Sequence, residues 1–141
     1  MFVYLLPISW SNIHPVLVHF TTALLPVSLV CDLVGKYLKR ESLTAAGWWT
    51  LFFGAVATPF TAVAGWLWMS DLISNGFHDP NLATHKWLGI SLVAGFLITA
   101  IWRVRFFKST AKPSIVYLVM AAAVVALLLY QGYLGGKMTL G

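Results

Sequence analysis

The chain has 141 residues, of which 60% are hydrophobic and only 9% are charged. About a quarter of the residues of a soluble domain are charged, so we expect this chain to lie in a bilayer, as one domain over residues 1–141. The net charge of +5 comes largely from short basic clusters between apolar runs, which predict membrane topology and are not a signature of nucleic-acid binding, so we expect no nucleic-acid partner. The single cysteine, Cys31, excludes an internal disulfide, and no Cys-x-x-Cys-His motif for covalent haem attachment is present.

Two apolar runs fill the first half of the chain, and we expect a membrane-spanning helix in each. The first helix, about residues 13–35, starts at Ser11 or Asn12 as its N-cap. The second, about residues 43–69, belongs to a run with no charge before Asp71, and small residues recur along it at three- to four-residue spacing. Such a stripe of small residues lets membrane helices approach closely. Both runs reach the ~20 residues that a span requires.

Two further runs fill the second half. Asp79 and Pro80 are typical of an N-cap and a first helical position, and they open the third span, about residues 81–102. A basic cluster follows this span. Pro113 then opens the fourth span, about residues 113–134, which is rich in alanine, valine and leucine.

Four spans with short connections predict an all-α, membrane-embedded antiparallel four-helix bundle. The basic residues concentrate in the first and third connections, which lie on the same side of such a bundle. Because positive charge collects on the cytoplasmic side, we expect both termini on the extracytoplasmic side of the inner (cytoplasmic) membrane.

The four histidines are the main functional signal, because ionisable side chains within membrane spans usually serve a function. His19 and His85 fall at matching depths, roughly 9 Å and 8 Å from the predicted helix starts at 1.5 Å per residue. The first and third helices are diagonal in a simple bundle, so the two imidazoles can ligate a planar macrocycle from both faces. We therefore predict haem b with His19 and His85 as the axial ligands of its iron.

The residues around these two histidines suit a flat cofactor. Ala23 follows His19 by about one helical turn, and Gly89 follows His85 in the same way, so bulk is missing where a macrocycle would lie. Trp87 is expected to line the site or to lie near the haem propionates.

His14 and His78 are closer to the membrane surface. His14 precedes His19 by five positions, about 140° around the helix, so the two cannot both point at one centre. We expect His14 at the rim of the site, as a propionate or capping partner. A second haem between His14 and His78 is one alternative, and hydrogen bonding of these imidazoles between helices is another.

One acidic residue lies inside the first span. Asp32 precedes Lys36 by four positions, a spacing that lets the two side chains pair on a helix. We interpret Asp32 as a paired or solvated charge at the inner rim and not as part of a proton relay.

The opening His-Pro-x-x-x-His segment, within residues 13–20, resembles that of a bacterial membrane family catalogued as domain of unknown function 2231. Members carry a histidine early in the third span, an arginine at its end and a late Gly-Gly segment, matched here by His85, Arg103, Gly135 and Gly136. The chain departs from this pattern at Thr21, where a proline is usual, and in its tail, which lacks the family's tyrosine.

The resemblance covers essentially the whole chain and implies a four-helix protein of the bacterial inner membrane. The family pattern includes His14, His19 and His85, whereas His78 does not belong to it. Some members are fused to Rieske-type iron–sulfur domains, which fits a b-type haem electron carrier.

These observations predict a haem protein that transfers electrons near the extracytoplasmic face. Its partners would be other membrane or extracytoplasmic redox proteins, with quinone as a further candidate. Such a carrier requires no substrate chemistry, so we do not expect an enzyme. Two alternatives stay open: a cofactor-free accessory or assembly subunit of a larger membrane complex, and a copper-handling protein. The copper ligands would be His14, His19, His85 and Met138, although the scarcity of methionine and cysteine argues against Cu(I).

Overall fold

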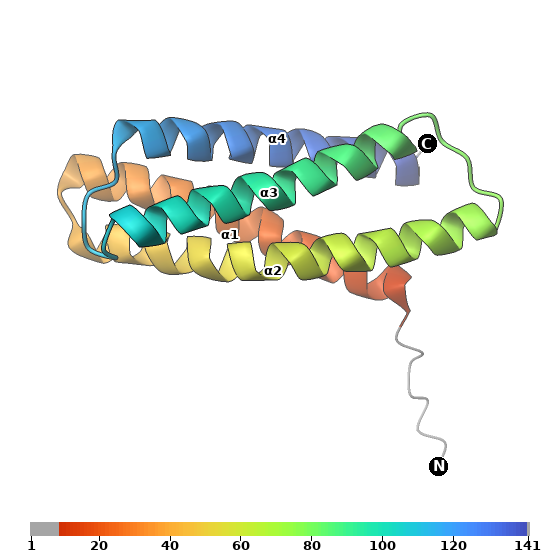
Figure 1. Cartoon of the computed structure of the whole chain (residues 1–141), viewed down its shortest axis with the longest axis horizontal. Coiled ribbons are helices and arrows are strands. Elements are labelled where there is room, and N and C mark those ends of the chain that lie inside the picture. The colour runs from red at the N-terminus through yellow and green to blue at the C-terminus, as the bar shows by residue number, and fades with distance from the viewer. Residues whose placement is uncertain (1–8, 141) are drawn as a thin grey trace, which may run out of the picture.

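The structure is a computed structural model that describes residues 9–140, with side chains as far as Met138. Its elements are four α-helices that lie side by side along the long axis of the molecule (Figure 1). Their bounds are α1 Trp10–Leu38, α2 Glu41–Ser74, α3 Leu82–Phe106 and α4 Ile115–Leu140. All four are long and apolar enough to cross a membrane, so the predicted all-α fold with four candidate spans is confirmed.

The helices extend beyond the predicted spans at most of their ends. α1 starts earlier than expected because Ser9 is its N-cap and accepts the N–H of Ser11 at 3.3 Å. α2 continues to Ser74, past Asp71, which is the first charged residue after the second apolar run. α3 begins later, at Leu82, because Pro80 lies in a turn that precedes the helix.

Consecutive helices run in opposite directions and form two hairpins, α1 with α2 and α3 with α4 (Figure 1). Helices α1 and α3 make no close backbone contact within residues 9–140, and neither do α2 and α4, so each pair is diagonal. The α1–α2 contact depends on small residues: a Cβ added at Gly54 would lie 2.9 Å from Cδ2 of Leu25. The small-residue stripe in α2 therefore packs against α1.

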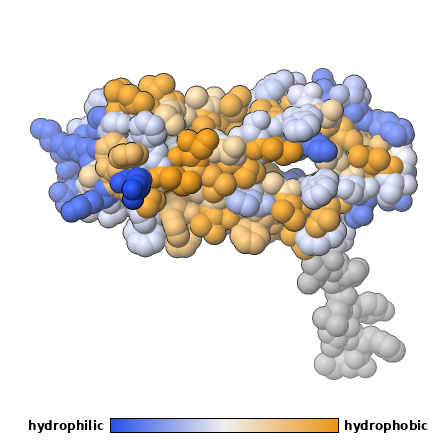
Figure 2. Space-filling model, viewed as in Figure 1, coloured by the Kyte–Doolittle hydropathy of each residue, from blue (hydrophilic) through white to orange (hydrophobic). Residues whose placement is uncertain are grey.

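The apolar core lies between the four helices. It is formed by Leu25, Leu51, Ala55, Leu92, Phe96, Ala100, Tyr117, Leu118 and Ala121. Many large apolar side chains of all four helices are exposed on the outside, and the visible face is mostly hydrophobic between more hydrophilic ends (Figure 2). This is the surface that a bilayer would cover.

The two ends of the bundle differ in composition. One end, called the basic end below, consists of the 39–40 turn and the 107–114 loop, and with the adjoining helix ends it carries seven of the nine lysine and arginine side chains. The other, called the histidine end, consists of the 75–81 loop, the start of α1 and the end of α4. All four histidines belong to the half of the molecule near the histidine end.

Candidate functional site

His14 lies in the second turn of α1 and faces α2. Its side chain is half-buried, and the Nδ1–H group donates a hydrogen bond of 3.0 Å to the carbonyl of Thr61. The imidazole also lies beside the indole of Trp68, with 5.7 Å between ring centroids. A Cβ added at Gly65 would come within 2.6 Å of Cε1 of His14, so only glycine leaves room for this ring.

His85 lies in the first turn of α3 and faces α4. A Cβ added at Gly135 would lie 3.2 Å from Cε1 of His85, and the amide of Gln131 donates a hydrogen bond of 2.9 Å to the His85 carbonyl. Nδ1 of His85 and Oε1 of Gln131 are both buried, and neither has a hydrogen-bond partner in the described part of the chain. Two unsatisfied polar atoms therefore lie together in this half of the bundle.

His14 and His85 belong to diagonal helices, and each faces the other helix of its own hairpin. His14 is four residues from the start of α1 and His85 three residues from the start of α3, so they lie about 6 Å and 4.5 Å along their helices. Figure 2 shows the surface hollowed between α2 and α3 in this half of the molecule. The structure thus places one imidazole from each hairpin at similar depth in the histidine end.

His19 does not face the interior, and the expectation that it points toward His85 is wrong. Its side chain is exposed, and its Nδ1–H group donates to the carbonyl of Pro15 at 2.6 Å, one turn back on the same helix. The reason is the rotation of α1 about its axis. Since His14 and His19 are about 140° apart on the helix, turning His14 toward α2 directs His19 outward.

The other residues considered for the site are distributed unevenly. Gly89 is close to it, since a Cβ there would lie 3.2 Å from Nε2 of Gln131. Ala23, Trp87 and His78 are exposed, and Trp87 has the ammonium of Lys86 5.9 Å from its ring centroid. No group of three or more histidine, cysteine, aspartate or glutamate side chains within the described residues is arranged to hold a metal ion.

A buried charge network near the basic end was missed by the sequence analysis. Asp32 and Arg103 are both fully buried and form an ion pair of 2.9 Å between Oδ1 and Nη2. The hydroxyl of Tyr117 donates to the second carboxylate oxygen at 2.8 Å. Asp32 therefore does not pair with Lys36, which instead donates to the carbonyl of Pro113 at 2.7 Å.

Arg103 connects the network to the neighbouring loops. Its guanidinium donates longer hydrogen bonds, of 3.3–3.4 Å, to the carbonyls of Thr44, Lys108 and Ala111. Gly47 makes room for the carboxylate, because a Cβ there would lie 2.7 Å from Oδ1 of Asp32. The signal in the sequence was one acid inside the first apolar run and one arginine directly after the third.

The profile of a family described as predicted membrane protein (DUF2231) matches residues 11–141. The chain belongs to the DUF2231 family. No curated protein and no solved structure matches it. Within this DUF2231 chain, the His-Pro-x-x-x-His segment supplies one interior imidazole, from His14, and one exterior imidazole, from His19.

Proposed function

We propose that this DUF2231 protein is a b-type haem electron carrier whose iron is ligated by His14 and His85. The observation that carries the proposal is the pair of half-buried imidazoles, one from each hairpin, at similar depth in the histidine end of an apolar bundle. Haem iron is commonly held by histidine axial ligands, and bound haem supplies one-electron Fe(III)/Fe(II) chemistry.

The hydrogen bond of His14 prepares its ring for ligation. Because Nδ1–H donates to the Thr61 carbonyl, the proton of the neutral imidazole is on Nδ1 and the lone pair is on Nε2. Metal-bound histidines commonly use this arrangement, in which a backbone carbonyl fixes the tautomer and the ring orientation. Gly65 supports it by leaving space for the ring against α2.

The environment of His85 also favours a bound group. A buried polar atom without a partner costs about 1–3 kcal/mol, and Nδ1 of His85 is such an atom within the described residues. Ligation and the ordered environment of a cofactor would offset that cost. Gly89 and Gly135 keep the neighbouring surfaces of α3 and α4 free of side-chain bulk around His85 and Gln131.

The distribution of charge supports the membrane orientation that we propose. The basic end would lie in the cytoplasm of a bacterial cell, so both termini and the histidine pair would be near the extracytoplasmic face of the inner membrane. Electron partners would then be extracytoplasmic or membrane redox proteins, or quinone in the bilayer.

The test is the visible spectrum of the full chain, purified in mild detergent from haem-replete cells and recorded oxidised and after dithionite reduction. We expect a Soret band and a reduced α band of low-spin haem. His14→Ala and His85→Ala should each abolish these bands or convert the spectrum to high spin. His19→Ala is the matched control, because it removes an exposed imidazole from the same helix. It should leave the spectrum unchanged, as should His78→Ala.

Two results would overturn the proposal. One is a purified protein without a Soret band under these conditions. The other is loss of the bands in His19→Ala together with their retention in His14→Ala, which would restore the pairing expected from sequence.

A further inference from the structure

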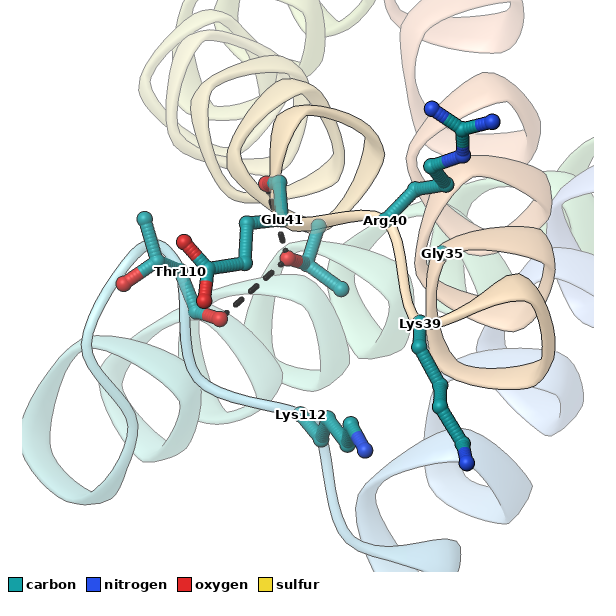
Figure 3. A pocket seen from close by; sticks show the side chains of 7 residues that line it. Gly35, Lys39, Arg40, Glu41, Thr110 and Lys112 are labelled. Atoms are coloured by element: carbon teal, nitrogen blue, oxygen red, sulfur yellow. Dashed lines mark hydrogen bonds between the residues drawn. The ribbon is translucent and has the colours of Figure 1, made fainter.

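A second candidate site lies at the basic end, at the opposite end of the bundle from the histidines. It is a pocket of about 330 Å³ between the 39–40 turn and the 107–114 loop (Figure 3). The residues that line it are Gly35, Lys39, Arg40, Glu41, Thr44, Thr110 and Lys112. Its volume is at the lower end of the range for small-molecule sites, about 300–1,000 Å³.

Positive charge dominates the pocket. Three of its lining side chains are cationic, and Glu41 is the one anion among them. Figure 3 shows Lys39 and Lys112 extending to the same side of the turn, whereas Arg40 extends to the opposite side and Glu41 extends toward Thr110. Both lysines therefore line the same pocket, although they belong to segments more than 70 residues apart in the chain.

The cations of the pocket have no carboxylate partner in the described part of the chain. The ion pair found among the described residues is Asp32 with Arg103, deeper in the bundle. Lys36 is also engaged, through the Pro113 carbonyl. Lys39 and Lys112 are exposed and available to an anion from outside.

The walls of the pocket are fastened to each other by hydrogen bonds. The hydroxyl of Thr44 donates to the carbonyl of Glu41 at 2.9 Å and to that of Thr110 at 3.4 Å. The carbonyls on either side of Lys112 are held as well: Ala111 accepts from Arg103 and Pro113 accepts from Lys36. The backbone that carries Lys112 is therefore preorganised, which lowers the cost of binding.

We infer that this pocket binds an anionic phosphate group, either that of an anionic phospholipid head group or free phosphate. Basic pockets between membrane helices bind phosphate-bearing lipid head groups. The pocket also borders the first turn of α2, which no side chain caps, so the partial positive charge of a helix N-terminus adds to that of the lysines. This site is independent of the proposed haem.

Native mass spectrometry of the full chain in mild detergent tests the inference. The protein is titrated with dioleoyl phosphatidylglycerol and, separately, with dioleoyl phosphatidylcholine, which has the same acyl chains and a neutral head group. We expect preferential binding of phosphatidylglycerol. A lysine near an anionic membrane surface is worth about 1 kcal/mol, so Lys39→Gln/Lys112→Gln should weaken that binding roughly 30-fold, about fivefold per lysine.

Lys108→Gln is the control for the change at Lys112, because it removes one charge from the same loop but from outside the pocket. It should keep the wild-type affinity. Inorganic phosphate is then added to the lipid-loaded protein: displacement of the lipid assigns the site to free phosphate, and retention assigns it to the lipid. Equal binding of the two lipids without any effect of phosphate would overturn the inference. Equal losses in Lys108→Gln and in the double variant would also overturn it.

Discussion

Replacing Asp32 by asparagine should destabilise the fold strongly, because it leaves the guanidinium of Arg103 buried without a counter-charge. The side chains of both residues are fully buried. The substitution removes the charge from the 2.9 Å ion pair and from the 2.8 Å hydrogen bond of Tyr117, and it leaves Arg103 with three carbonyl contacts of 3.3–3.4 Å. Removing one partner of a buried pair costs about 3–5 kcal/mol.

The assay is unfolding in mixed detergent micelles with increasing SDS, followed by the loss of far-UV circular dichroism. Asp71→Asn is the control, because it neutralises an exposed carboxylate in another helix. A loss smaller than about 1 kcal/mol for Asp32→Asn, the size expected of a surface pair, would refute the reasoning.

A compensating variant separates the cost of an unpaired charge from a general packing defect. Replacing a buried ion pair by apolar residues of similar volume is often neutral or stabilising by about 1–4 kcal/mol. Asp32→Leu/Arg103→Met/Tyr117→Phe should therefore recover most of the stability lost in Asp32→Asn. A triple variant no more stable than the single one would show that the polar contacts themselves hold the helices together.

Three further substitutions each add a methyl group at a single glycine. Gly47→Ala should destabilise by about 1–3 kcal/mol in the same SDS assay, because the new Cβ would meet Oδ1 of Asp32 at 2.7 Å. Gly132→Ala, at an exposed site in α4 with no atom within 4 Å of the new Cβ, should instead stabilise by about 0.5–1 kcal/mol. Gly65→Ala should leave the protein folded but shift or abolish the haem spectrum, because its Cβ would displace His14; an unchanged spectrum would contradict this ligand assignment.

The four helices could be predicted from sequence because each is a long apolar run bounded by charges or by proline. Their ends could not, since polar residues at a membrane surface continue a helix as readily as they end it. Ser74, for example, belongs to α2, with its hydroxyl bonded to the carbonyl of Asp71.

The candidate site was only partly predictable. Periodicity shows that His14 and His19 point in different directions, but the rotation of α1 that selects His14 depends on packing against Gly65 and Thr61 in another helix. The Asp32–Arg103 pair joins residues 71 positions apart. Helical spacing favours a partner four residues away on the same helix, and it cannot identify a partner on another helix.

The 71 positions between Asp32 and Arg103 also affect the order in which the helices can insert during synthesis. At about 5–20 residues per second, a ribosome reaches the arginine codon roughly 4–14 s after the aspartate codon, and Tyr117 follows later still. During that interval the carboxyl group of the nascent α1–α2 hairpin has neither of its final partners. A charged carboxylate without a partner is costly inside a bilayer, so we expect the hairpin to reach its final depth only after α3 emerges. Insertion of α3 would bring Arg103 to Asp32. Insertion of α4 would then bring Tyr117 and complete the network.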